Sequence, residues 1–327
     1  MSSDCLTPEQ HAIYKSPIYL CFITWNLLIA TLTFILTFFA LKSLIYRSIL
    51  PKPTILLLIS LLIFGNIHQL FYILMKIRFI FRVFSAESPC DILDYAVNCR
   101  VITSGMLGAA WGCVFMQIAL SFERMLATVF EAVHRKLRYW YCGVSIGFVF
   151  CSSFSLIPII SNQDSGEDRV QNCGYLSTQA GQTINMINDI FLIFTIFQVF
   201  FDILLLKYSV VLEKRKNFKI TERYQSIESL KSTQAMFFLS ISHFFFTILN
   251  LTIIVTLNYL RSFISFQILS LILTVIYITP YSCLFSPIVL LLTLNHIKNQ
   301  RKTTIRSMVQ QKQTQSSHLT EMRKMWN

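Results

Sequence analysis

Charged residues are what this sequence has least of. Asp, Glu, Lys and Arg make up 13% of its 327 residues, whereas a soluble domain has roughly a quarter. More than half of the residues are hydrophobic, 54%, and the mean hydropathy is positive, +0.57. This composition excludes a single soluble globular core and indicates several membrane-spanning segments.

Two common enzyme signatures are also missing. The sequence has no HExxH zinc motif and no glycine-rich phosphate loop, and we therefore expect no catalytic residue, no metal site and no cofactor. Internal repeats of the kind that mark transporters are not visible either.

Seven apolar segments are each close to the roughly 20 residues needed to cross a bilayer. The fifth holds two acidic residues, and the seventh, the longest, contains Pro280 and Pro287, which we expect to kink it. The first is too long for the apolar region of a signal peptide, so we expect it to stay in the protein as an anchor. The predicted spans are Ile18–Leu41, Thr54–Met75, Val101–Phe122, Trp140–Ile160, Ile184–Leu206, Ala235–Leu257 and Phe263–Leu294.

Basic residues predict the orientation of these spans. Three quarters of the 28 lysines and arginines lie after spans one, three, five and seven, and such residues are enriched on the cytoplasmic side. We therefore expect an extracellular tail over 1–17, an all-α seven-helix membrane domain over 18–294 and a basic cytoplasmic tail over 295–327. Membrane topology then accounts for the net charge of +12, and no nucleic-acid partner is expected.

Within the tail, we expect the stretch His296–Met308 to form a helix on the inner membrane surface. The remainder is polar and basic, and we expect it to be disordered.

A charged pair, Glu123-Arg124, ends the uncharged run from Val101 to Phe122. Because an ionised pair in hydrocarbon costs several kcal/mol, we expect it at a membrane surface. The predicted orientation places it at the cytoplasmic end of span three, where it is a candidate conformational switch. The alternative is an arginine that simply extends to the interface and has no switching role.

Four cysteines are predicted on the external side, where disulfides form: Cys5, Cys90, Cys99 and Cys173. Four cysteines allow three pairings, and the spacing alone does not choose among them. Cys99 precedes Arg124 by 25 residues, which in a helix is roughly 37 Å and enough to cross the membrane.

These features resemble the G-protein-coupled receptor superfamily and, more narrowly, the nematode serpentine chemoreceptors of class alpha. The superfamily resemblance lies in seven spans, an external N-terminus, and a span-three cysteine followed by an acidic-Arg pair with a second cysteine after span four. The residues that carry the narrower resemblance are Ser121-Phe122-Glu123-Arg124 with Ala127-Thr128, Arg223-Tyr224-Gln225 with Glu228 and, more weakly, Asp4-Cys5 and Ile35-Leu36-Thr37-Phe38.

The resemblance implies a plasma-membrane receptor, in sensory neurons, for a small external ligand. It implies that Arg124 meets the alpha subunit of a heterotrimeric G protein after activation, that Glu123 restrains it at rest, and that Cys99 pairs with Cys173. The chain departs from rhodopsin-like receptors at Met125, where tyrosine is usual, and at Ser286-Pro287, where Asn-Pro-x-x-Tyr is usual. Only the arginine and the disulfide are therefore carried over.

Polar residues within the spans are candidate ligand contacts: Asn66, His68, Asp189 and His243. The alternatives are interhelical packing for the span-two pair, solvation for Asp189 and a hydrogen-bonded core role for His243. We expect Asp202 to contact Lys207 or the interface.

Two phenylalanine clusters, Phe191-Phe194-Phe197 and Phe244-Phe245-Phe246, either line an apolar ligand pocket or face lipid. At the level of function, the alternative to a receptor is a ligand-gated channel or transporter with seven spans. A transporter would be expected to show paired broken helices at the midplane.

Overall fold

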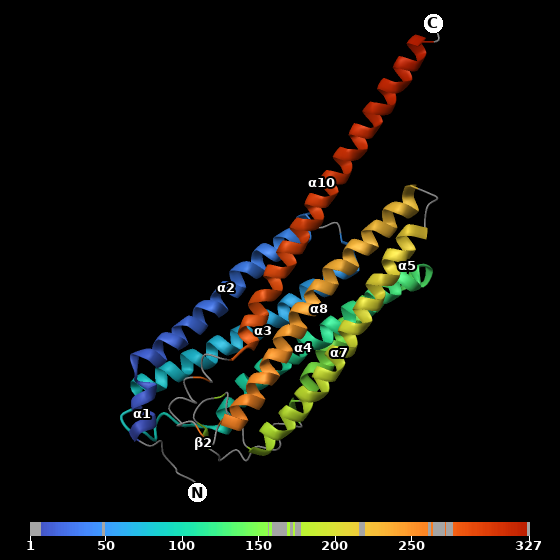
Figure 1. The fold of residues 1–327 in the computed structure, drawn as a ribbon. Coiled ribbons are helices and arrows are strands. Elements are labelled where there is room, and N and C mark those ends of the chain that lie inside the picture. Colours follow the sequence, from blue (N-terminus) through green and yellow to red (C-terminus); the bar gives the residue numbers. More distant parts are fainter. Residues whose placement is uncertain are drawn as a thin grey trace.

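A computed structural model of the chain describes residues 8–47, 50–155, 157–158, 169–170, 173, 178–215, 220–260, 263, 272 and 277–325. Long helices run side by side as a bundle (Figure 1), so the predicted all-α membrane fold is confirmed. The elements in chain order are α1 (Pro8–Tyr14), α2 (Pro17–Arg47), α3 (Lys52–Ser85), β1 (Asp94–Tyr95), α4 (Ala96–Val129), α5 (Glu131–Ser155), β2 (Arg169–Val170), α7 (Thr178–Arg215), α8 (Ile220–Leu260) and α10 (Thr279–Met325).

Six of the described helices are long and apolar enough to cross a membrane, namely α2, α3, α4, α7, α8 and α10. The fourth predicted span, Trp140–Ile160, lies on α5, whose first turns carry Arg135, Lys136 and Arg138. The uncharged part of α5 is therefore short within the described residues, because the predicted span continues past Ser155 into residues that are mostly outside them.

The bundle has two distinct ends. The N-terminal end carries α1 and the β1–β2 pair, and α10 projects from the opposite, C-terminal end (Figure 1). The strands are antiparallel, with Asp94 opposite Val170. Asp94 also forms ion pairs with Arg78 at 2.6 Å and Arg82 at 2.7 Å, so the connection after α3 is held against the end of α3.

Helix α10 differs from the predicted seventh span. It begins at Thr279, and most of residues 261–276 lie outside the described part. Pro280 is its second residue, a position that needs no N–H donor, so this proline begins α10 and does not interrupt it. A kink between α10 and the earlier part of the predicted span falls outside the described residues. Pro287 does lie inside the helix. The helix continues to Met325 and projects beyond the bundle (Figure 1). The expected helix over His296–Met308 is therefore present, and the expectation that the residues after it are disordered was wrong.

One match to the Gly-x-Ser-x-Gly pattern of serine hydrolases occurs at Gly143-Val144-Ser145-Ile146-Gly147. It lies inside α5, whereas the hydrolase nucleophile needs a sharp turn between a strand and a helix. The match therefore carries no catalytic meaning.

Helix α4 is the centre of the bundle. It packs against α3, α5, α7 and α8, and 61% of its most apolar stretch is buried, against 44% or less in the other candidate spans. Glycines permit this close packing, as in other membrane bundles. A Cβ added at Gly112 would lie 2.3 Å from the Phe64 ring on α3, and one at Gly108 would lie 2.8 Å from the Phe154 ring on α5.

Gly112→Ala should therefore destabilise the bundle. The Phe64 ring is only 2% exposed and has little room to move, so we expect a loss of about 1–3 kcal/mol in the free energy of unfolding. Thermal melting of the purified protein in lipid nanodiscs measures this loss. Gly147→Ala on α5 is the control, because a Cβ there meets nothing within 4 Å and alanine favours a helix over glycine. Equal melting temperatures for the two variants would contradict the packing argument.

Candidate functional site

Arg124 lies on α4 near the C-terminal end of the bundle and is only 1% exposed. Its Nη1 donates to Ser232 Oγ on α8 at 2.8 Å, and its Nη2 donates to Thr54 Oγ1 on α3 at 2.6 Å. Its Nε and Nη2 also donate to the two carboxylate oxygens of Glu123. The guanidinium thus joins two other helices to α4.

Glu123 is fully buried and has partners beyond the arginine. It accepts a hydrogen bond from Thr54 Oγ1 at 3.3 Å, and its Oε1 lies 3.1 Å from His134 Nε2 on α5. The Glu123–Arg124 pair therefore connects α3, α4, α5 and α8. This enclosure by neighbouring helices does not fit the alternative of an arginine extended to the interface.

A second polar cluster lies next to this pair along α4 and involves Asp202. The Asp202 carboxylate is 3% exposed and accepts a hydrogen bond from Ser121 Oγ at 3.1 Å. Gln198 on α7 donates to Ser121 Oγ at 3.1 Å and to Ser240 Oγ on α8 at 3.2 Å. The expected contact of Asp202 with Lys207 or the interface was wrong, because Asp202 faces the inside of the bundle and links α4 to α7.

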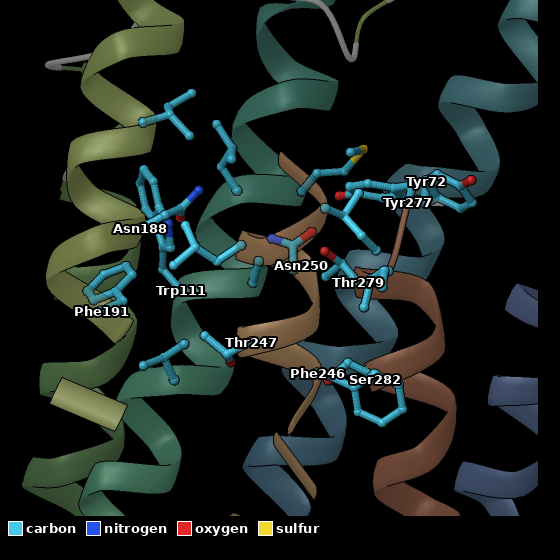
Figure 2. A pocket seen from close by; sticks show the side chains of 18 of the residues that line it. Tyr72, Trp111, Asn188, Phe191, Phe246, Thr247, Asn250, Tyr277, Thr279 and Ser282 are labelled. Atoms are coloured by element: carbon cyan, nitrogen blue, oxygen red, sulfur yellow. The ribbon is translucent and has the colours of Figure 1, made fainter. Parts of the chain in front are cut away.

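A pocket of about 420 Å³ opens between α3, α4, α7, α8 and α10, in the half of the bundle nearer the N-terminal end. Trp111 and Phe191 line one side, Tyr72 and Tyr277 line the other, and Asn250 points between them (Figure 2). The volume lies within the range of small-molecule sites.

A smaller cavity of about 40 Å³ lies beside the pocket and is lined by Gln117 of α4. Four residues, Ala110, His243, Thr279 and Ser282, line both spaces. The two cavities therefore share one wall.

The four expected ligand contacts lie in different places. His243 lines the pocket. His68 is fully buried beside it, stacked on Tyr277 with 3.1 Å between His68 Nε2 and Tyr277 Oη, which favours the packing interpretation. Asn66 is half-buried and is not among the pocket-lining residues. Asp189 is exposed, because its position on α7 is turned about 100° from that of Asn188.

The phenylalanine clusters divide between the two interpretations. Phe191 and Phe246 line the pocket. Phe194, Phe197 and Phe245 are 52%, 66% and 59% exposed and face outward, where lipid would lie.

Several pocket residues were missed by sequence reasoning, among them Lys76, Tyr72, Trp111, Asn188 and Asn250. Lys76 directly follows the predicted end of span two, so the predicted boundary assigns it to the external loop and not to the bundle. The spacing could have indicated this contact, because Tyr72 and Lys76 are four residues apart and would share one face of a continuous helix.

Cys99 and Cys173 are joined by a disulfide at the N-terminal end of the bundle. Cys173 lines the pocket, and its carbonyl accepts a hydrogen bond from Thr103 Oγ1 on α4 at 2.6 Å. The disulfide and this hydrogen bond together hold Cys173 at the pocket wall. Asp94 lies within 4.8 Å of both sulfurs, but oxidised cysteines are not metal ligands.

Cys173→Ala should make Cys99 a free thiol. Denatured, unreduced protein treated with a maleimide-coupled polymer should then gain one labelled cysteine in spite of losing one, as read from the shift on a gel. Cys283→Ala, which removes a buried free cysteine, is the control and should lose one label. An unchanged label count in Cys173→Ala would contradict the pairing.

Comparison with known proteins adds the family. The model of the serpentine type 7TM GPCR chemoreceptor Sra matches residues 1–326. Serpentine receptor class alpha-11 of Caenorhabditis briggsae is 30% identical over 99% of this chain and 97% of its own length. The class alpha-11 and class alpha-13 receptors of Caenorhabditis elegans are each 30% identical over 98% of this chain and 97% of their own length.

Proposed function

Because the chain belongs to the serpentine seven-span GPCR chemoreceptor family Sra, a receptor family and not an enzyme family, we propose that it binds a small external molecule in the pocket and signals through a heterotrimeric G protein. The observation that carries the proposal is the burial of Arg124 by partners on α3, α4 and α8, at the opposite end of α4 from the disulfide. In this arrangement the arginine is held away from any partner at the bundle's end until the helices separate.

The proposed orientation places the N-terminal end of the bundle outside and the projecting end of α10 in the cytoplasm. The distribution of lysine and arginine supports it. We propose the plasma membrane, and by family the membrane of sensory neurons, as the location. The pocket then faces the medium, and Arg124 lies on the G-protein side.

Release of Arg124 requires movement of α8. The Arg124–Ser232 hydrogen bond, 2.8 Å long, joins α4 to α8 at the proposed cytoplasmic end. If that part of α8 moves outward, the bond breaks and a gap opens beside the guanidinium. A ligand favours this state only if it binds the open packing more tightly than the closed one.

A ligand-gated channel or transporter is the alternative. Membership in a receptor family does not favour it. Ligand-evoked current without recruitment of a G protein would support the alternative and contradict the proposal.

Arg124→Ala should abolish ligand-evoked recruitment of a mini-G probe, because the side chain that contacts the G protein is gone. The assay uses cells that express the full chain with an N-terminal tag, and a panel of volatile and water-soluble odorants. Staining of the tag on intact cells reports both surface level and an external N-terminus. We expect a fall in recruitment of about tenfold or more at equal surface level.

Removing one partner of a buried ion pair costs about 3–5 kcal/mol, so Arg124→Ala can fail to reach the surface. Arg124→Lys keeps the charge, loses the planar fork and provides the second variant, for which we expect weakened recruitment. Arg138→Ala removes an exposed arginine of α5 near the same end and should leave recruitment unchanged. If both Arg124 variants recruit the probe at the wild-type level, the proposed role of Arg124 in G-protein coupling is refuted.

Glu123→Gln should raise basal recruitment without ligand. The amide keeps the shape of the side chain but removes the charge that holds the guanidinium, and hydrogen bonds to charged groups are worth about 1.5–3 kcal/mol. A loss of about 1.4 kcal/mol shifts the equilibrium about tenfold toward the released state, measured as mini-G recruitment in untreated cells.

Glu87→Gln is the matched control, since Glu87 is exposed after the end of α3 at the opposite end of the bundle. It should leave basal recruitment at the wild-type level. A basal level in Glu123→Gln no higher than in Glu87→Gln would argue against Glu123 as the restraining partner.

A further inference from the structure

One charged side chain lines the pocket. Among the described residues at its wall, Lys76 is the only one with a formal charge, and no Asp or Glu accompanies it. The other polar groups at the wall are neutral amides, hydroxyls and His243. A pocket with this lining offers a binding partner one positive charge and no negative one.

Within the described part of the chain, Lys76 has no carboxylate counter-ion. It is 7% exposed, and no carboxylate oxygen in the described part of the chain lies within 4 Å of its Nζ. It lies over the Tyr72 ring, with Nζ 5.3 Å from the ring centroid. A cation over an aromatic ring is stabilised by about 0.5–2 kcal/mol, which is less than the cost of burying an ammonium group.

Among the described residues at this end of the bundle, the buried acidic residue is Asp94, and it already has partners. Asp94 is 3% exposed and forms ion pairs with both Arg78 at 2.6 Å and Arg82 at 2.7 Å. Two arginines thus compensate its single charge. The charge of Lys76 is therefore left for something that enters the pocket.

We infer that the ligand of this pocket carries an anionic head group that pairs with Lys76, with an apolar body between the aromatic walls. An ionisable residue within a membrane bundle is expensive unless it serves binding or transport, and a bound carboxylate would supply the missing counter-ion. The inference rests on the proposed receptor function, because it concerns the ligand of the same pocket.

The walls fit an apolar body. Tyr72 and Tyr277 stack at 5.3 Å on one side, and Trp111 and Phe191 lie 6.0 Å apart on the other (Figure 2). The head group would sit at the Tyr72 side, where Lys76 lies against the ring. The ligand class is therefore small amphipathic acids, such as a medium-chain or aryl carboxylate.

Direct binding to the purified full chain in zwitterionic nanodiscs tests this assignment. The probes are octanoate and phenylacetate, each compared with its uncharged methyl ester, and the readout is the shift in melting temperature with probe concentration. Wild-type protein should bind an acid about tenfold or more tightly than its ester. Lys76→Met should lose this preference, and Lys76→Arg should keep it.

Lys15→Met is the control, since it removes an exposed lysine at the same end of the bundle and should keep the preference for acids. If Lys76→Met does not fold, Lys76→Gln replaces it. The inference is overturned if acids and esters bind wild-type protein equally, if neither class binds, or if the preference survives without Lys76. Binding here needs no G protein, so a failure of Arg124-dependent recruitment would refute the proposed coupling and leave this result intact.

Discussion

The burial of the Arg124 charge is the constraint on which the half of the bundle nearer its C-terminal end depends. Placing a guanidinium and a carboxylate away from water costs several kcal/mol per ion, and their attraction compensates only when the remaining donors are also satisfied. Thr54 and Ser232 meet that requirement, and they come from two different helices. The pair is therefore stable only if α3, α4 and α8 meet at one point. A single arginine thus couples the positions of three helices, and a state in which they separate must offer the charge another partner.

One face of α4 connects the pocket to this arginine. The pocket is lined on this helix by Thr103, Met106, Ala110, Trp111 and Val114. The same face continues at intervals of three or four residues with Gln117, Ser121 and Arg124, a spacing that keeps side chains on one side of a helix. About 15 Å separates Val114 from Arg124 along the axis. The space between holds the small cavity and the Ser121–Gln198–Ser240 hydrogen bonds. These are groups whose partners change when α7 and α8 shift, so the face supplies a physical route for coupling, although contiguity alone is not coupling.

The sequence was sufficient to predict features that depend only on the order and spacing of residues along the chain. Six of the seven predicted spans coincide at least in part with helices long and apolar enough to cross a membrane. They follow from apolar runs, the pair Glu123-Arg124 from a break in such a run, and the candidate cysteines from their compartment. Features that depend on the rotation of a helix were not accessible. Asp189 and Asn188 are adjacent, yet Asn188 lines the pocket and Asp189 is exposed, and only the packing of α7 decides which one turns inward. Lys76 was missed because the predicted span ends too early: it ends at Met75, whereas helix α3 extends to Ser85.

Lys76 and Arg124, the two cations buried in the described part of the bundle, differ in a way that bears on how binding and release are joined. Arg124 is matched by a carboxylate of its own chain, so the resting packing satisfies it. No carboxylate among the described residues matches Lys76, so in our inference the ligand supplies its counter-ion. Helix α8 contributes both Asn250 at the pocket and Ser232 at the arginine, about 27 Å apart along its axis. If an anion at Lys76 brings the pocket walls together, a small tilt of α8 moves Ser232 away from Arg124. The stabilisation gained at one cation can then offset what is lost at the other, and the ligand shifts the equilibrium only by that difference.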